Sequence, residues 1–144
     1  MLKEYLSENN IIIKEEIEDW EKAIALASSP LLESRKIEKG YVEEMIDSVK
    51  RLGPYIVISP QIAIAHSRPN GMVNQVSLSL LKLNRPVNFS AGDYEATLIF
   101  VLAAIDNEQH LGILRNLAEM LSDEEKVRQL INAQSKYEIR NLLD

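Results

Sequence analysis

Two stretches in the first half of the chain carry apolar residues at helical spacing. In the first stretch, residues 20–27, the apolar side chains fall at i, i+3, i+4 and i+7, which predicts an amphipathic helix. Acidic residues around Asp19 lie at its start, where the helix dipole favours negative charge. We expect this helix to end or kink at Pro30, because proline lacks a backbone N–H and crowds the preceding turn. Residues 41–52 repeat the helical spacing, and Gly53 with the proline after it ends this second predicted helix.

The pattern changes to short apolar runs in the middle of the chain. Residues 55–58 and 62–65 form two such runs joined by a proline-containing turn, which predicts two strands. Residues 76–83 begin with alternating apolar and polar positions, as a half-buried strand does. Residues 97–105 contain no charge, and their β-branched and aromatic content favours a central strand covered on both faces over a buried helix. The triplet 11–13 predicts a further small strand.

Helical patterns return in the last third of the chain. Apolar residues at helical spacing in residues 111–121 predict an amphipathic helix. Two short helices are expected after it, one with Ser122 as the N-cap and Glu125 three residues on, the other with Ser135 as the N-cap and Glu138 three residues on.

The order of these elements is helices, then strands, then helices, which is typical of an α/β layered domain. We therefore expect a mixed sheet of about five strands flanked by helices. The length of 144 residues corresponds to about one domain. No repeat, low-complexity tract or linker-like stretch divides the chain, so a single domain is expected over residues 1–144.

The composition excludes several classes of function. The sequence has no cysteine, which removes disulfides, thiolate metal sites and cysteine nucleophiles. The 16 Lys and Arg residues against 22 Asp and Glu residues leave a formal net charge of −6, the opposite of the basic balance of nucleic-acid binders. No long uncharged apolar run is present, and the first residues lack the apolar core of a signal peptide. We expect a cytoplasmic protein that neither binds nucleic acid nor inserts into a membrane.

The two histidines are the strongest candidates for chemistry. His66 follows the apolar run 62–65 and opens a polar loop, so it is expected at the carboxyl end of a strand, where α/β sheets bind ligands. His110 follows the run 97–105 and the acidic loop that begins at Asp106, and it lies in the first turn of the next predicted helix. If the two strands are neighbours, both imidazoles emerge at one edge of the sheet.

Other interpretations of these residues stay open at this point. Either histidine can be an ordinary side chain, His66 on a surface loop and His110 at a helix start, where the helix dipole keeps it neutral. With Asp106 they match the ligand types of a two-histidine, one-carboxylate metal site, although no HxH or HExxH spacing supports one. Ser67 does not lie in a GxSxG nucleophile elbow, and no GxGxxG or Walker loop indicates a nucleotide site.

Three segments of the chain resemble a known family. They are GPYIVISPQIAIAHSRPNG (residues 53–71), VSLSLLKLNRPVNF (residues 76–89) and LIFVLAAIDNEQHLGILRNLAEML (residues 98–121). They are similar to the mannitol/fructose-type (type 2) enzyme IIA domain of the bacterial phosphoenolpyruvate-dependent sugar phosphotransferase system, and most to its ascorbate-type branch. The helical opening is also similar, so the resemblance covers nearly the whole chain.

The resemblance implies a phosphotransferase component in which His66 carries the phosphoryl group as a phosphohistidine and His110 lies beside it to stabilise the phosphate. It implies HPr, a carrier with a basic face, as the phosphate donor. The implied acceptor is a sugar-specific IIB component, with the membrane component IIC behind it, and ascorbate or a related pentose or alditol is the indicated sugar class. Arg68 and Ser67 are the expected phosphate-binding residues. No cofactor or metal is expected.

The chemistry of the side chains agrees with this role. A neutral imidazole, with an ordinary pKa of ~6.5, has a free lone pair at neutral pH, so His66 can attack phosphorus without a separate base. One ring nitrogen must be held by an acceptor, for which we expect a backbone carbonyl, so that the other stays bare. The resemblance implies that the attacking atom is Nε2. We expect Ile64 and Met72, near the histidine loop, to contribute an apolar docking patch.

Three residues depart from the pattern of the family. Gln61 stands where glycine is common, Ala65 replaces the proline before the histidine, and Ser67 replaces an alanine. None of these changes removes a reacting group, although Ala65 lacks the fixed φ of proline. The departures leave open a regulatory docking module with the same fold. A metal-dependent hydrolase is a separate alternative, which metal analysis of the purified protein would test.

Overall fold

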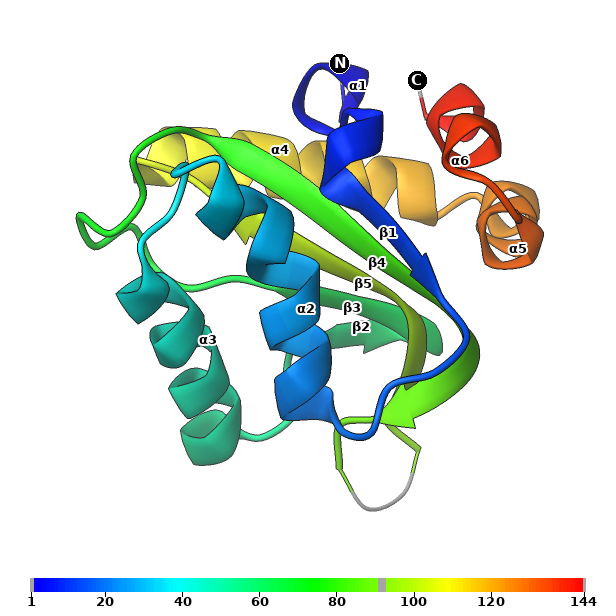
Figure 1. The fold of residues 1–144 in the computed structure, drawn as a ribbon, viewed down its shortest axis with the longest axis horizontal. Helices are drawn as coiled ribbons and strands as arrows, with labels where there is room; N and C mark the ends of the chain where they lie inside the picture. Colours follow the sequence, from blue (N-terminus) through cyan, green and yellow to red (C-terminus); the bar gives the residue numbers. More distant parts are fainter. Residues whose placement is uncertain (1, 91–92, 144) are drawn as a thin grey trace.

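A mixed sheet forms the centre of the computed structural model, which describes residues 2–90 and 93–143 (Figure 1). Its strands are β1 (Ile11–Lys14), β2 (Val57–Ser59), β3 (Gln61–Ala65), β4 (Ser77–Asn88) and β5 (Glu95–Ala103). Within the described residues their order in the sheet is β1-β4-β5-β3-β2. The pairs β1–β4 and β3–β5 are parallel, whereas β4–β5 and β2–β3 are antiparallel. The mixed sheet of five strands predicted from the sequence is confirmed.

Helices cover both faces of this sheet (Figure 1). On one face lie α2 (Trp20–Glu33) and α3 (Lys39–Leu52). On the other lie α1 (Leu2–Tyr5), α4 (Asn107–Leu121), α5 (Glu124–Asn132) and α6 (Lys136–Leu142), and a 3-10 turn, η1 (Glu8–Asn10), leads into β1. Among the described residues, no helix is both long and apolar enough to cross a membrane.

Strands β3 and β5 are buried on both faces, which the sequence predicted for β5. Along β3, Ile62 and Ile64 pack into the core beneath α4, while Ala63 and Ala65 pack toward α2 and α3. The two strands are parallel neighbours, and their last ladder pair is Ala65 with Val101. Because parallel strands end at the same edge of a sheet, the loops after β3 and β5 emerge side by side.

Of the two outcomes predicted at Pro30, an end or a kink, the end does not occur, because α2 continues to Glu33. The missing N–H of Pro30 leaves the carbonyl of Leu26 without its helical donor, and the hydroxyl of Ser29 donates to that carbonyl at 2.7 Å instead. Leu31, just beyond the proline, is fully buried in the core. Burial of this last turn, together with the replacement hydrogen bond, outweighs the cost of the proline.

The caps of the C-terminal helices differ in one respect from the prediction. Asp123, not Ser122, is the N-cap of α5, and its carboxylate accepts from the backbone N–H groups of the first turn. The Ser122 hydroxyl instead donates to the carbonyl of Glu119 at the end of α4. Ser135 caps α6 as predicted, because its hydroxyl accepts from the N–H of Glu138 at 3.1 Å.

Candidate functional site

The two histidines meet at the edge where β3 and β5 end. His66 directly follows β3, and His110 lies in the first turn of α4, just after β5. Their ring centroids are 5.1 Å apart and the ring planes are inclined by 58°. The neighbouring-strand arrangement that the sequence left conditional is therefore present, and it brings both imidazoles together.

The His66 ring is held in one orientation by its own strand. Its Nδ1 lies 2.8 Å from the carbonyl oxygen of Ile64. A carbonyl only accepts, so Nδ1 carries the proton and Nε2 keeps its lone pair. Tyr55 packs edge-on against the ring, with centroids 5.8 Å apart. The backbone carbonyl expected from the sequence is thus present, and it leaves Nε2 free of hydrogen bonds to the described residues.

His110 is positioned by the start of α4. The carboxylate of Asp106 caps this helix by accepting from the N–H of Gln109 at 2.9 Å. The Nδ1 atom of His110 is buried and has no hydrogen-bond partner among the described residues. Burial, and secondarily the nearby His66, hold the pKa of His110 below its ordinary value, so the ring is neutral at pH 7.

A cleft of about 630 Å³ opens beside the two rings. It is lined from α3 by Glu44, Ser48, Arg51 and Leu52, from the segment after α3 by Tyr55, from the loop after β3 by His66, Ser67, Arg68 and Pro69, and from α4 by Asn107 and His110. The exposed guanidinium groups of Arg51 and Arg68 form no ion pair with any described residue. The cleft therefore combines a bare imidazole nitrogen with two guanidinium groups that are not held in ion pairs, and the Glu44 carboxylate is the acidic group in its lining.

All four residues singled out from the sequence line this cleft. His66, His110, Arg68 and Ser67 come together there, although Ser67 is itself almost fully buried. The carboxylate of Asp106 is engaged as a helix cap, and no cluster of three or more potential metal ligands exists in the described part of the chain.

Sequence reasoning missed the contribution of α3. Tyr41 has the periodicity of a core residue, and its fully buried hydroxyl reaches the histidine loop: it accepts from the N–H of Ser67 at 3.1 Å and lies 2.7 Å from the carbonyl of Leu102. Burial raises the pKa of Tyr41 to about 12, so the hydroxyl stays protonated. Arg51 had only one signal in the sequence, its place at the end of the second predicted helix.

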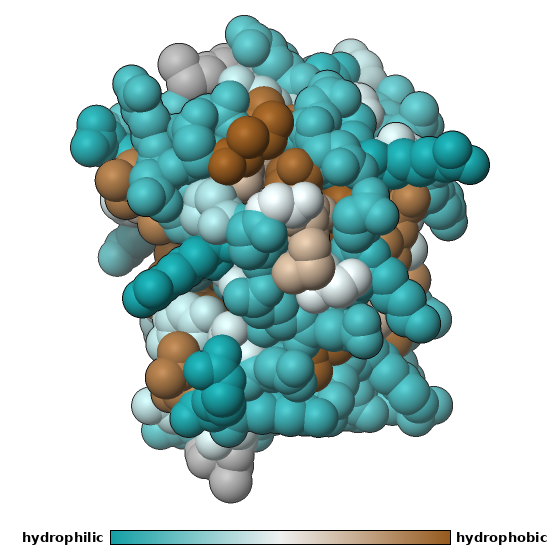
Figure 2. All heavy atoms as spheres, turned by 90° about the vertical axis from the view of Figure 1, so that its left-hand side faces the viewer, coloured by the Kyte–Doolittle hydropathy of each residue, from teal (hydrophilic) through white to brown (hydrophobic). Residues whose placement is uncertain are grey.

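The surface around the cleft exposes apolar side chains. Leu52 and Tyr55 line the cleft, and Ile105 and Leu111 flank the start of α4; all four are more than two-fifths exposed. Figure 2 shows this side of the molecule, where apolar patches interrupt a largely polar surface.

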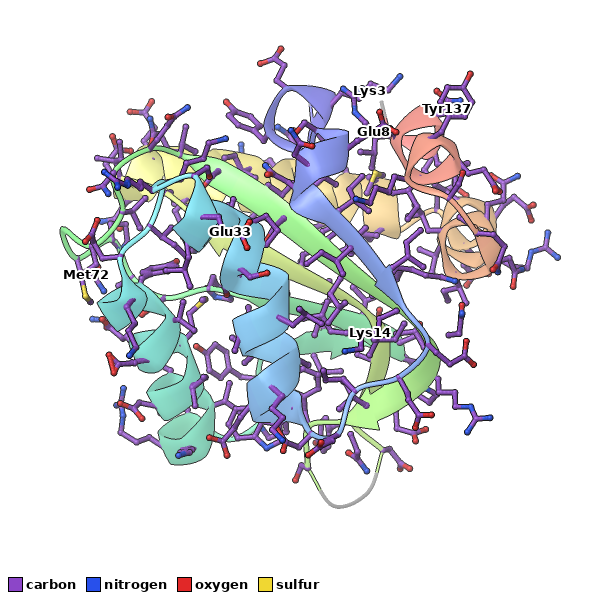
Figure 3. The ribbon with its side chains drawn as sticks, viewed as in Figure 1. Lys3, Glu8, Lys14, Glu33, Met72 and Tyr137 are labelled. Carbon is purple, nitrogen blue, oxygen red and sulfur yellow. The ribbon has the colours of Figure 1, made fainter. Side chains whose placement is uncertain are left out.

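The docking patch expected from the sequence is wrong in one of its two residues. Ile64 is fully buried, because β3 is covered on both faces and Ile64 lies on the face beneath α4. Met72 is half-buried and lies at the outer end of the loop that follows β3 (Figure 3).

The fold and the sequence together define the class of this protein. The chain matches the family model for the phosphoenolpyruvate-dependent sugar phosphotransferase system, EIIA 2, over residues 4–144. It therefore belongs to this family of phosphotransfer components, and the resemblance drawn from its three segments is confirmed.

Individual relatives span almost the whole chain. The mannitol-specific cryptic phosphotransferase enzyme IIA component of Escherichia coli (strain K12) is 30% identical over 142 residues, covering 99% of this chain and 97% of its own. Its solution structure superposes with a TM-score of 0.91. The ascorbate-specific EIIA component of the same strain is 30% identical over 147 residues, covering 99% and 95%. The E. coli complex of enzyme IIA mannitol with phosphorylated IIB mannitol contains a chain that is 26% identical, with a TM-score of 0.84 and 94% of each chain covered.

Proposed function

We propose that this chain is a cytoplasmic phosphoryl carrier that accepts a phosphoryl group from phospho-HPr on His66 and passes it to a sugar-specific IIB component. The observation that carries the proposal is the 2.8 Å contact between His66 Nδ1 and the carbonyl of Ile64, because it leaves Nε2 as a bare nucleophile beside His110. Membership of the family supports the transfer role.

The proposed step is balanced without an outside base. The Nε2 lone pair of neutral His66 attacks phosphorus while the N–P bond to the donor imidazole breaks. A donor ring that carries a proton on its other nitrogen leaves as a neutral imidazole. His66 then holds the phosphoryl group on Nε2 and the original proton on Nδ1, where the carbonyl of Ile64 stabilises the positive ring. The reverse chemistry passes the group to the IIB residue, a cysteine by resemblance to the family.

Charge stabilisation in the cleft comes from the residues that line it. Phosphoryl transfer depends mainly on positioning and on neutralising the phosphoryl oxygens. We assign this role to the N–H of neutral His110, to the Arg68 and Arg51 guanidinium groups and to Ser67. One cation and one unit of phosphate charge ~4 Å apart attract by ~4 kcal/mol at an effective dielectric of ~20, before desolvation. This supports a carrier state that is stable and still transferable.

The partners follow from the same face of the molecule. The relative solved in complex with phosphorylated IIB supports a IIB component as the acceptor, with the membrane component IIC reached through it. The exposed apolar residues around the cleft supply contact area for both HPr and IIB, which would bind in turn. We propose a IIB of an ascorbate-type or related pentose or alditol system, and a role for residues 1–144 as a single carrier domain that needs no cofactor.

The test is a reconstituted relay. The protein is incubated with enzyme I, HPr and phosphoenolpyruvate, then with IIB components of the ascorbate and mannitol types. We expect acid-labile, alkali-stable phosphate on the wild-type chain, no label on His66→Ala, and discharge by one of the IIB proteins. Label that persists in His66→Ala contradicts the assignment. An unlabelled wild type that still binds IIB points to the regulatory docking module instead.

A further inference from the structure

We propose that Tyr41 is a positioning residue for phosphoryl transfer: its hydroxyl fixes the backbone that carries His66 against the strand that leads to His110. This inference rests on the proposed function, because it concerns the rate at which His66 accepts the phosphoryl group. The proposed role belongs to the hydroxyl oxygen alone. The ring of Tyr41 packs in the core, as any aromatic ring at this position would.

The hydroxyl lies between the two strands just past the end of their ladder. The last pair of β3 and β5 is Ala65 with Val101. Beyond it the Tyr41 hydroxyl accepts from the N–H of Ser67 at 3.1 Å, and it lies 2.7 Å from the carbonyl of Leu102 and 3.3 Å from that of Ser67. A hydroxyl has one proton, and the shorter contact assigns it to Leu102. The hydroxyl thus links β5 to the residue that follows His66.

This link has no substitute nearby. Ser67 is 7% exposed and Tyr41 and Leu102 are fully buried, so water has little access to the Ser67 N–H. Without the hydroxyl, the Ser67 N–H is buried and unpaired, which is unfavourable. We expect the loop after β3 to move until this N–H reaches water or another acceptor. His66 is the adjacent residue and would move with it. The Nδ1 bond to Ile64 holds the ring on β3. The ladder between β3 and β5 ends at Ala65 and Val101, so beyond that pair the Tyr41 hydroxyl links the backbone after His66 to β5.

The consequence for transfer is one of geometry rather than docking. Displacement of a reacting group by about 1 Å lowers rates by up to ~100-fold, because the attacking lone pair loses its alignment with phosphorus. The hydrogen-bond partners of the Tyr41 hydroxyl are backbone groups of Ser67 and Leu102, so its removal leaves the exposed side chains of the proposed docking surface, such as Leu52 and Leu111, in place. Loss of the hydroxyl is therefore expected to lower kcat about 10–100-fold while KM for phospho-HPr stays within about twofold.

The experiment compares Tyr41→Phe with Ser79→Ala. Phenylalanine keeps the ring and removes only the hydroxyl. Ser79 is a matched control, because its fully buried hydroxyl also donates to a backbone carbonyl, that of Ala27 at 2.6 Å, but on β4 beneath α2 and away from the cleft. Steady-state transfer from phospho-HPr is measured for both variants at a temperature where each is folded. The His66 ring signals are recorded by ¹⁵N NMR before phosphate is added.

For Tyr41→Phe we expect a lower kcat and shifted or broadened His66 ring signals. For Ser79→Ala we expect unchanged kcat and unchanged His66 signals. The melting temperature should fall in both variants. Wild-type kcat in Tyr41→Phe, or an equal kcat loss in Ser79→Ala, overturns the inference. These outcomes are separate from failure of the proposed function, which would appear as the absence of label on His66 in the wild-type chain itself.

Discussion

The imidazole rings of His66 and His110 lie 5.1 Å apart, one at the end of β3 and the other in the first turn of the helix after β5. The carbonyl of Ile64 fixes the proton of the first ring on Nδ1, and burial keeps the second ring neutral. A neutral pair has a nucleophile and a hydrogen-bond donor side by side without charge repulsion. This relationship underlies the account of phosphoryl transfer given above.

Replacement of His110 by alanine is expected to slow phosphorylation of His66 without preventing it. The His110 N–H is proposed to donate to the incoming phosphoryl group, and loss of a hydrogen bond to a charged group costs about 1.5–3 kcal/mol, or roughly ten- to a hundredfold in rate. Rapid-quench labelling from phospho-HPr measures this directly. The His110 pKa is also expected to rise in the phosphorylated wild type, because the charged ring gains a partner. Wild-type rates together with an unmoved His110 resonance would make it an ordinary helix-start residue.

The depressed pKa of His110 also predicts a pH dependence of stability. The folded state binds this proton less readily than the unfolded state, where the pKa is ~6.5. The free energy of unfolding is therefore unaffected by this group above that value and falls as the pH drops below it. Urea denaturation at pH 7.5 and pH 5.8 should show a smaller decrease for His110→Ala than for the wild type. Equal decreases in the two proteins would contradict the assignment.

The positions of the two histidines could be predicted from the sequence because they depend on local pattern, an apolar run followed by a polar loop. The role of Tyr41 could not be predicted. Its spacing places it in the core, which is correct, but only the packing of α3 places its hydroxyl at the end of the β3–β5 ladder. The place of Arg51 in the cleft could not be predicted either, because a charged side chain at a helix end usually points into solvent.

Tertiary packing decides two points at which the structure departs from the sequence prediction. Ile64 lies two residues from His66, yet it is fully buried because β3 is covered on both faces. An end or a kink is predicted at Pro30, and the adjacent Ser29 hydroxyl together with the buried Leu31 allows α2 to continue to Glu33. Both outcomes depend on tertiary packing that periodicity does not contain.

Gln61 occupies a backbone conformation that favours glycine. Its φ is 75°, and its Oε1 atom is buried without a partner among the described residues. The left-handed conformation costs a residue with a Cβ atom about 1–2 kcal/mol, and glycine avoids this cost. Glycine loses more backbone entropy on folding, which offsets about 0.5–1 kcal/mol of the gain. The backbone change alone is therefore expected to raise the free energy of unfolding of Gln61→Gly by about 0.5–1 kcal/mol, and removal of the unpaired buried oxygen adds to this gain.

The matched control for this variant is Arg35→Gly. Arg35 has φ 59° in the turn that ends α2, but its side chain is exposed. Arg35→Gly therefore gains the same relief of the left-handed backbone but removes no buried amide. Urea denaturation should show less stabilisation for Arg35→Gly than for Gln61→Gly. A larger effect at Arg35 would contradict the explanation based on the buried amide.

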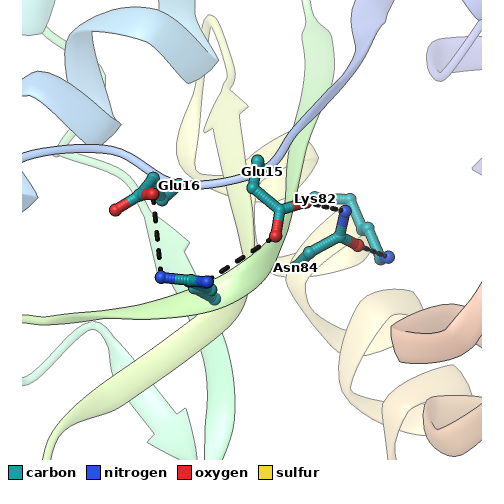
Figure 4. A network of polar contacts seen from close by, with 5 residues as sticks. Glu15, Glu16, Lys82 and Asn84 are labelled. Atoms are coloured by element: carbon teal, nitrogen blue, oxygen red, sulfur yellow. Dashed lines mark hydrogen bonds and ion pairs between the residues drawn. The ribbon is translucent and has the colours of Figure 1, made fainter.

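Lys82 is a charged residue in the core of β4, with no solvent-exposed surface. Its ammonium donates to Asn84 at 2.7 Å, and Asn84 donates to Glu15 at 2.8 Å (Figure 4). Burial lowers the pKa of Lys82, although Glu15 and Glu138 oppose the shift. Lys82→Met should therefore increase stability at pH 7 by about 1–3 kcal/mol, because a buried charge is replaced by an apolar side chain of similar shape.

The sign of the pH effect provides a second check on Lys82. A lowered folded-state pKa means that the unfolded state binds the proton more readily, so wild-type stability should rise as the pH increases toward 10.5. Lys82→Met lacks this rise. Denaturation between pH 7 and pH 10 measures both slopes, and parallel slopes would show that another group dominates.

The family resemblance implies that the proposed donor HPr has a basic face, and the net charge of −6 then predicts an electrostatically assisted encounter. The Debye length falls from ~10 Å at 0.1 M salt to ~3 Å at 1 M, so the association rate constant should decrease as salt is added. Stopped-flow association at 0.05 M and 0.5 M NaCl tests this expectation. A rate constant that is independent of salt would leave apolar contact as the basis of recognition.

Locating the phosphoryl group on the imidazole ring tests the proposed transfer to His66 Nε2 most directly. The chain, labelled with ¹⁵N in its histidines, is phosphorylated by enzyme I, HPr and phosphoenolpyruvate, and long-range ¹H–¹⁵N spectra are recorded. We predict phosphate on Nε2 of His66, with the proton retained on Nδ1 against the carbonyl of Ile64. Phosphate on Nδ1 of His66, phosphate on His110, or no phosphohistidine at all would contradict the account.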